Sequence, residues 1–314
     1  MKKLIKNYLN QGFLINLLFI GLFAIISVIY FYPLLSGKQI KQSDIDQFAG
    51  MSKQIVDHRS QYNEEPFWLD NAFLGMPSYQ VLVEYPFDLL DKIDQLIRFL
   101  PRPADYLFVY LVSFFLLLLT LKVKSEYAFI GAIAFAFSTY LIIILGVGHN
   151  TKALAIGYAP IVLAGLFKIL DKKYLAGFII GALGLGLQIN ANHYQMTYYF
   201  LMLVGLITII NVFDDFFKKK ISDGLNKIGV VCATTLFAIS LNATAILATQ
   251  EYSDFSTRGS SEISINPDGS EKEDLSGLSN EYITEYSYGK LESFNLIVPR
   301  FMGGGSSELI DKDS

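Results

Sequence analysis

The sequence is short of cysteine and of charge, and each shortage argues against a class of protein. Cys232 is the only cysteine among 314 residues, so no disulfide can form within the chain. Charged residues make up only 17% of the chain, whereas an ordinary soluble domain is about a quarter charged. The basic residues are confined to short clusters beside apolar segments, and nothing indicates nucleic-acid binding.

What the chain has in abundance is apolar sequence. Hydrophobic residues make up 52% of it, and the mean hydropathy is +0.39. They gather in blocks of about 17 to 23 residues, the length of helix that crosses a hydrocarbon core of about 30 Å. The pattern predicts an all-α, polytopic membrane helical bundle with about seven transmembrane helices. The blocks lie near 13–35, 104–121, 127–145, 153–170, 174–190, 196–213 and 228–249.

Positive charge predicts the orientation of these helices. The lysine clusters all fall on one side of the predicted topology, and by the positive-inside rule that side is the cytoplasm. They comprise Lys2, Lys3 and Lys6; Lys122 and Lys124; Lys168, Lys172 and Lys173; and Lys218, Lys219, Lys220 and Lys227. The N-terminus is then cytoplasmic, and we expect a multi-pass membrane protein.

The same topology divides the chain into two predicted domains. Residues 1–249 form the seven-helix module, with a long extracytoplasmic loop at 36–103. Residues 250–314 form an extracytoplasmic segment with 13 acidic and 5 basic residues, and its part 256–280 has the composition of a flexible loop. The stretch 291–301 is apolar again but no further span follows, so we expect this chain to be an N-terminal portion of a longer protein.

The loop 36–103 contains one amphipathic stretch, at 84–100. Its apolar residues recur at helical spacing and its charged residues fall on the other face. We interpret it as a helix on the membrane surface, with packing against the rest of the loop as the alternative. The apolar face holds Leu89, Leu90, Ile93, Leu96, Ile97 and Leu100, and the charged face holds Asp88, Asp91, Asp94 and Arg98.

Three polar clusters lie on the predicted outer side, and the first is Gln42 to Phe48. Its carboxylates, Asp44 and Asp46, are suited to general-base catalysis or to binding a divalent cation. In an extended segment the two would point to one side, whereas in a helix they would diverge. The alternative is a solvated acidic loop.

The second cluster, at 146–152, contains His149, Asn150 and Lys152. Lys152 stands on the side that lysines otherwise avoid, near a helix N-terminus whose dipole disfavours a cation. An anion there would resolve the conflict, so the cluster predicts a phosphate site. The alternative is that Lys152 simply reaches lipid headgroups.

The third cluster, at 188–195, has side chains that can hydrogen-bond a sugar or another polyol. They are Asn192, His193, Tyr194 and Gln195. The alternative is that they cap two helix ends. Gly181, Gly184 and Gly186 just before them have the spacing of close helix packing. Trp68, in the outer loop, could stack on a sugar face or anchor the loop.

In its outer loop the chain resembles the bacterial YfhO family of membrane proteins. The motifs that carry the resemblance are Ser43-Asp44-Ile45-Asp46-Gln47-Phe48, Trp68, Phe73-Leu74-Gly75-Met76-Pro77 and Tyr85-Pro86-Phe87-Asp88-Leu89-Leu90. The form with Gly-Met-Pro and His-Asn-Thr-Lys resembles the Bacteroidetes branch. Members of the family are much longer, which agrees with an N-terminal portion.

The family in turn resembles the GT-C glycosyltransferases, which take sugar from a polyprenyl-phosphate donor on the outer side. By that resemblance Asp44 is the general base, with Asp46 a less secure match, and His149 and Lys152 steady the departing lipid phosphate. The implied partners are membrane lipids, the donor and a cell-surface glycan or lipid acceptor. Asp44 and Asp46 would be the ligands if a cation such as Mg²⁺ or Mn²⁺ took part.

Two other functions are compatible with seven apolar helices: a transporter or flippase, and a non-catalytic membrane scaffold. Transporters place polar and charged residues near the bilayer midplane. Here the predicted spans are almost free of ionisable residues and polarity gathers at one surface, which favours surface chemistry. A single site requires Asp44, His149 and Lys152 to lie within about 15 Å of one another.

Overall fold

The computed structural model describes residues 2–256, 259, 265, 268–270, 280–285, 287–298 and 301–302. These residues are mostly helical, with only two strands of two residues each, which confirms the predicted all-α class. The chain forms two compact units, Met1–Ile246 and Leu247–Ser314. Most of the predicted flexible loop 256–280 and the end of the apolar stretch 291–301 lie outside the described residues.

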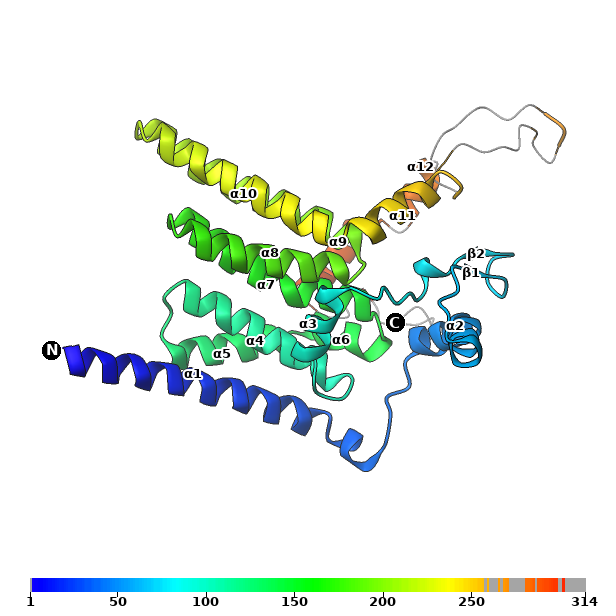
Figure 1. Ribbon diagram of the computed structural model, residues 1–314, viewed down its shortest axis with the longest axis horizontal. Coiled ribbons are helices and arrows are strands. Elements are labelled where there is room, and N and C mark those ends of the chain that lie inside the picture. The colour runs from blue at the N-terminus through cyan, green and yellow to red at the C-terminus, as the bar shows by residue number, and fades with distance from the viewer. Residues whose placement is uncertain are drawn as a thin grey trace. The chain divides into compact units, whose positions relative to one another are not determined.

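The first unit contains a bundle of long helices and an outer segment of shorter elements (Figure 1). The bundle helices are α1 (Lys2–Tyr30), α4 (Ala104–Thr120), α5 (Ser125–Ala136), α6 (Thr139–Val147), α7 (Asn150–Leu170), α8 (Tyr174–Asn190), α9 (Tyr194–Phe217) and α10 (Ile221–Leu241). The outer segment holds η1 (Tyr32–Ser36), α2 (Ser43–Tyr62), β1 (Trp68–Leu69), β2 (Met76–Pro77), η2 (Ser78–Gln80) and α3 (Leu89–Ile97). Helix α11 (Ala243–Ser253) crosses the boundary, and α12 (Asn280–Thr284) and η3 (Glu292–Leu296) belong to the second unit.

The helices are long and apolar enough for a multi-pass membrane protein. Four of them meet the length and hydropathy of a span: the Gly12–Tyr30 part of α1, α7, α9 and α10. Helices α5 and α6 are bent by 50° at a short break and make a fifth if the pair counts as one span. Helices α4 and α8 are apolar but have 17 residues each. All seven predicted blocks are therefore helical, but three of them are each divided between two helices: 13–35 between α1 and η1, 127–145 between α5 and α6, and 228–249 between α10 and α11.

Helices α7 and α8 pack against each other without side chains between them at one point. A β-carbon added at Gly165 would overlap the backbone of Gly181, so only glycine allows this approach. Gly184 is pressed in the same way against Ile161 and Val162. These contacts confirm that the glycines of α8 serve close helix packing.

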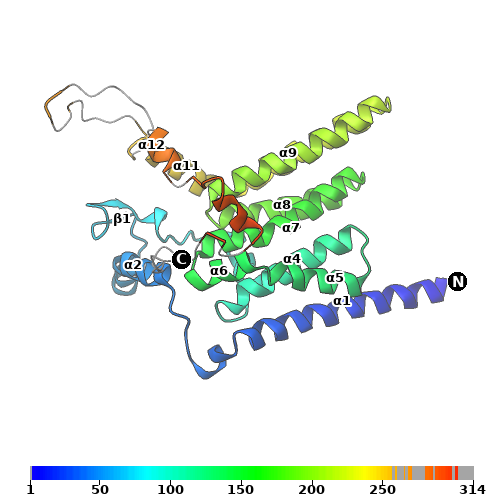
Figure 2. The same ribbon diagram turned by 180° about the vertical axis from the view of Figure 1, so that it is seen from behind.

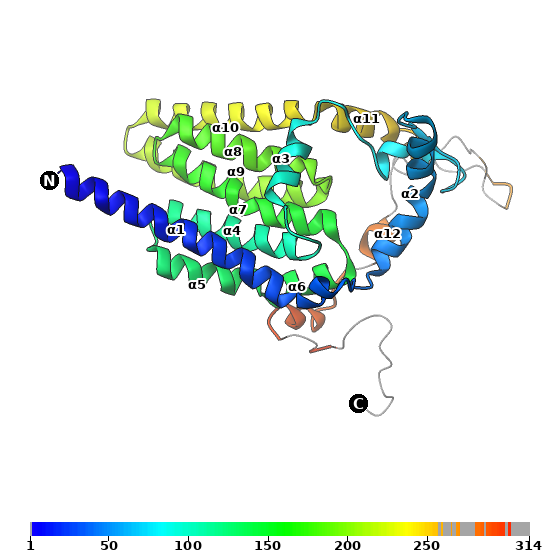
Figure 3. The ribbon, with the colours of Figure 1, turned by 60° about the horizontal axis from the view of Figure 1, so that its bottom comes forward.

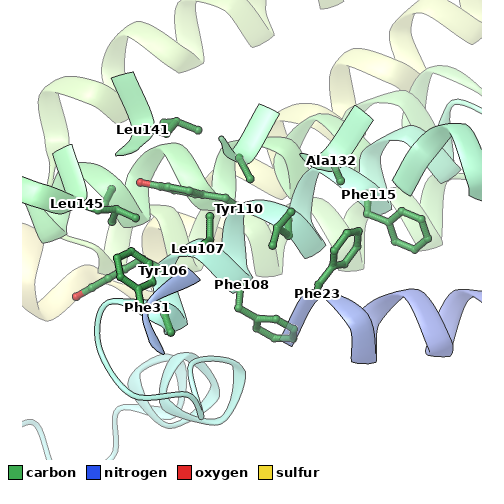
Figure 4. Packing of buried hydrophobic residues seen from close by; sticks show 14 of the residues in the cluster. Phe23, Phe31, Tyr106, Leu107, Phe108, Tyr110, Phe115, Ala132, Leu141 and Leu145 are labelled. Atoms are coloured by element: carbon green, nitrogen blue, oxygen red, sulfur yellow. The ribbon is translucent and has the colours of Figure 1, made fainter. Parts of the chain in front are cut away.

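A second core, rich in aromatic residues, joins α4 to α1 and α5 (Figure 4). Phe23 of α1 is fully buried and meets the ring of Phe115 edge-on, with centroids 5.4 Å apart. The ring of Phe129 stacks on Phe23 from the other side at 5.0 Å. Small residues of α5, among them Ala132, let the helices come close enough for these rings to interlock.

The turns at one end of the bundle share one conformation. Lys122, Lys172 and Lys219 all have left-handed backbones, with φ between 58° and 64°, where they follow α4, α7 and α9. We call this end of the bundle the lysine end. The end that holds the α6–α7 and α8–α9 turns is called the histidine end. Figures 1 and 2 show these two groups of turns at opposite ends of the bundle. A cation is favourable at each of these helix C-termini because exposed carbonyls carry partial negative charge.

Helix α3 runs across the bundle helices (Figure 3) and packs on α8, where Leu90 lies against Gly186. Its orientation corrects the sequence interpretation. Asp94, expected on the charged outer face, is only 4% exposed, whereas Leu96, expected on the apolar face, is 77% exposed. Buried polar partners on the bundle hold Asp94 inward, and α3 therefore packs on the helices themselves.

Candidate functional site

The start of α2 lies on the α6–α7 turn, although the two are about a hundred residues apart in sequence. The amide of Gln42 donates a hydrogen bond to the carbonyl of Leu145 at 2.5 Å. At the turn Gly148 has φ +92°, and a β-carbon there would come within 3.0 Å of the Gln42 side chain. Glycine thus serves both the left-handed turn and the close approach. This contact brings the first predicted cluster to the second.

Asp44 and His149 form a short hydrogen bond at this contact. The distance from Asp44 Oδ2 to His149 Nδ1 is 2.6 Å, and both side chains are partly exposed. An ionised carboxylate can only accept a hydrogen bond, so Nδ1 carries the proton. The structure therefore joins the outer loop to the helix junction in one polar centre.

Asp46 does not share this position. The helix α2 begins at Ser43, and two residues along a helix turn the side chain by about 200°, so Asp46 faces away from Asp44 and is exposed. Within the described part of the chain there is no group of three or more His, Cys, Asp or Glu residues placed to hold a metal ion. Asp44 and Asp46 therefore diverge, as expected for a helical segment and not for an extended one.

Lys152 stands one turn into α7 from His149, as the sequence predicted. It is partly buried, and no carboxylate of the described residues lies within 4 Å of its ammonium group. It nevertheless acts on a third residue. Burial, and then the charges of Lys152 and His149, lower the pKa of His193 below its ordinary value. His193, between α8 and α9, therefore lies within electrostatic reach of both.

His193 has a structural role of its own, as the sequence also allowed. It is the N-cap of α9, and its Nδ1 accepts a hydrogen bond from the amide of Met196 at 3.4 Å. This bond requires an unprotonated Nδ1, which agrees with the lowered pKa. His193 thus presents a neutral ring beside the cation of Lys152.

The other residues of the third cluster point in different directions. Asn192 forms the turn, with φ +60°, and Tyr194 packs on the apolar core between α7, α8 and α9. The amide of Gln195 donates to the hydroxyl of Tyr199 at 3.3 Å on the surface. Of this cluster, His193 is the residue whose pKa is affected by His149 and Lys152.

Trp68 lies on a different part of the outer segment. Its ring packs over Gly75 across the β1–β2 hairpin, where Trp68 pairs with Pro77. The hairpin is tied to α2 through Gln54, which accepts hydrogen bonds from the amides of Asp70 and Asn71. Gln54 is ten residues beyond Asp44, about 15 Å along the helix. The indole therefore anchors this hairpin and is not part of the Asp44 centre.

Sequence reasoning missed a buried charge cluster on α3, α4 and α7. Arg98 of α3 bonds to Asp94 and, at 2.9 Å, to Asp105 at the start of α4. The hydroxyl of Tyr158, in α7, donates to Asp94 at 2.5 Å. Burial opposes the charge of Arg98, but the hydrogen bond and attraction of Asp94 outweigh it and raise the pKa of the guanidinium. The cluster ties α3 to α4 and α7. Its one sequence signal was Asp105, an acidic residue at the start of an apolar block.

Comparison of the chain with protein-family models, curated proteins and solved structures finds no match. The resemblance to the YfhO family therefore rests on the outer-loop motifs, and the functional argument rests on the geometry around Asp44.

Proposed function

We propose that the chain is the membrane module of a GT-C-type inverting glycosyltransferase in a bacterial cytoplasmic membrane. It transfers a sugar from a polyprenyl-phosphate donor to a cell-surface glycan or lipid. In this proposal the bundle crosses the membrane seven times, with α4 and α8 as short spans and α5–α6 as a bent one. The N-terminus and the lysine end face the cytoplasm, and the histidine end faces outward.

The observation that supports this function best is the contact between Asp44 and His149 at 2.6 Å. The sequence argument assigned these residues to two halves of one reaction, the base and the phosphate site. Glycosyl transfer needs both halves within the length of one sugar phosphate. The pairing satisfies the requirement that the two clusters belong to a single centre.

The phosphate half of the site consists of the N-terminus of α7 and Lys152. The exposed amides at the start of a helix carry partial positive charge and attract phosphate. Lys152 adds a full charge that no nearby carboxylate of the described residues neutralises. Negative charge grows on the phosphate as the bond to the sugar breaks, so these groups bind the transition state more strongly than the donor.

The placement of the buried charges argues against the rival transporter. Asp105 is the second residue of α4, and Asp215 lies in the last turn of α9. Asp94 and Arg98 belong to α3, which does not span. Transporters need ionisable residues along a path near the bilayer midplane. Here the buried acids stand at or near helix ends and pair with other protein groups.

The test is to replace Asp44 by Asn in the full natural protein, in the cells that express it. We expect Asp44→Asn to deplete one sugar from the extracted surface glycans, because loss of general-base catalysis lowers the rate by about 10²- to 10⁴-fold. Asp57→Asn is the matched control, since Asp57 lies on the same helix and pairs with exposed Lys53. Normal glycosylation in the Asp44→Asn cells, at normal protein level, would sink the proposal.

A further inference from the structure

We propose that the proton acceptor of this site is Nε2 of His149, and that Asp44 is the positioning residue that orients the imidazole. The inference rests on the proposed glycosyl transfer and changes the division of labour within it. The resemblance to GT-C enzymes makes the carboxylate the base. The geometry points to the ring that the carboxylate holds.

The contacts of Asp44 favour the ring as the base. Oδ2 accepts from His149 Nδ1 at 2.6 Å, whereas the hydroxyl of Ser43 is 3.5 Å from Oδ1, at the limit of a hydrogen bond. An acceptor hydroxyl that took the place of the imidazole on Oδ2 would break the shorter of these contacts. Since Nδ1 carries the proton, the neutral ring has its lone pair on Nε2. A carboxylate fixing the tautomer and direction of a basic imidazole is the arrangement of a general-base dyad.

The imidazole of His149 is placed to meet a substrate. It is 47% exposed, and no hydrogen bond from the described residues reaches its Nε2. His193, the other histidine nearby, uses Nδ1 to cap α9. His58 lies in the second half of α2, stacked against Tyr62. Of the three histidines, only His149 combines a carboxylate partner with an open second nitrogen.

The step balances without an added reactant. The acceptor oxygen forms a bond to the anomeric carbon while its proton passes to Nε2 of His149. The bond from that carbon to the phosphate oxygen breaks, and its electron pair leaves with the polyprenyl phosphate. The imidazolium then stands between Asp44, which stabilises it, and Lys152, one helical turn away. The proton finally passes from Nε2 to the phosphate product or to water.

This division explains why the base adjoins the phosphate site. The imidazole gains a positive charge at the moment the phosphate gains a negative one. Two cations, the new imidazolium and Lys152, then face the leaving group. If Asp44 took the proton itself, the site would lose a negative charge but would gain no cation next to the phosphate.

The experiment uses the full protein in lipid vesicles, with a polyprenyl-phosphate sugar as donor and extracted surface glycan as acceptor. We expect His149→Ala to lower the transfer rate by about 10²- to 10⁴-fold. Imidazole added to the buffer should restore part of the rate in His149→Ala and leave the parent unchanged. His58→Ala should transfer at the parent rate. Rescue by imidazole shows that His149→Ala is folded and lacks only the base.

A double variant separates the two roles. If Asp44 acts only through His149, Asp44→Asn combined with His149→Ala is no slower than His149→Ala alone. Multiplied losses, or a His149→Ala protein as fast as the parent while Asp44→Asn is inactive, would overturn the inference and leave glycosyl transfer standing. No transfer by the parent from any polyprenyl-phosphate sugar would overturn both.

Discussion

The two ends of the bundle differ in how their positive charges are paired. At the lysine end four lysines pair with carboxylates of the same or neighbouring turns. These pairs are Lys122–Asp171, Lys172–Asp223, Lys218–Asp214 and Lys227–Asp215. At the histidine end Arg98 has two carboxylates, His149 has one, and Lys152 has none within 4 Å among the described residues.

The paired cations at both ends hold helices together, whereas Lys152, like Lys168 and Lys173 at the lysine end, has no carboxylate within 4 Å among the described residues. A cation neutralised by its own protein ties helices together and has little attraction left for an anion. The charge of Lys152 remains available to an anion. Burial lowers the pKa of His193, so this neighbour does not add a charge of its own. Substitutions that remove a charge or its partner at each end test this comparison. Four of them follow, ordered from the largest expected effect to the smallest.

The largest effect is expected from Asp94→Ala at the histidine end. It leaves Arg98 buried with one partner fewer and the hydroxyl of Tyr158 without its acceptor. We expect a loss of about 3–5 kcal/mol in the free energy of unfolding, measured by denaturant titration in detergent. The control is Asp91→Ala on the same helix, where only a hydrogen bond to Gln95 is lost. Equal effects of the two variants would mean that the buried cluster does not hold α3.

A comparable loss, about 3 kcal/mol or more, is expected from Asp215→Ala at the lysine end. Asp215 and Lys227 are both nearly buried, and Asn211 alone cannot balance the ammonium charge. The adjacent Asp214 offers a strict control because its pair with Lys218 is exposed. Asp214→Ala should cost about 0.3–0.5 kcal/mol. Thermal unfolding of the purified variants decides the matter, and similar melting temperatures would contradict the burial argument.

An intermediate effect, on binding and not on stability, is expected from Lys152→Gln. Loss of a charge-assisted hydrogen bond costs about 1.5–3 kcal/mol, which weakens the affinity for polyprenyl phosphate by about 10- to 100-fold. Titration of the lipid into protein-containing vesicles measures it. Lys122→Gln, which removes an exposed lysine at the other end, should leave the affinity unchanged. Identical affinities for the two variants would remove the distinction between the ends.

The smallest effect is a pH dependence due to His193. Burial first, and then the charges of Lys152 and His149, place its folded pKa below its ordinary value of 6.5. The unfolded chain then binds more protons than the folded one between those two values, so stability is full above pH 6.5 and falls as the pH drops below it. We expect the melting temperature to fall less between pH 8 and pH 5 in His193→Asn, since Asn caps a helix without titrating. His58→Asn should keep the slope of the parent, and an unchanged slope in His193→Asn would refute the assignment.

The sequence predicted which segments are helical, because runs of apolar residues of this length have few alternatives to a helix. The interruptions were less visible. Ser138 and Asn242 are small polar residues at breaks in apolar blocks, and only the folded chain shows that Asn242 donates to the carbonyls of Gly186 and Ala238. A block can thus change helix without a change in composition.

For the candidate site, sequence could place Asp44 and His149 on one side of the membrane but could not measure the gap between them. Their distance depends on Gly148 and Gln42, whose contact joins distant segments. The inward turn of Asp94 was likewise hidden, because its partner Tyr158 lies 64 residues away. Periodicity predicts which residues share a face of a helix. Which of these faces packs inward depends on the partners that the rest of the fold offers.

The buried charge cluster that holds α3 limits how the outer segment can move. With Arg98 fixed between α3, α4 and α7, residues 36–103 are not one long tether between α1 and α4. They are a loop from α1 to a fixed point, followed by a short connection. That loop is pinned again near its beginning, where Gln42 and Asp44 hold the α6–α7 turn. Any movement of this loop away from the α6–α7 turn therefore has to release the contacts at the start of α2, while α3 stays fixed.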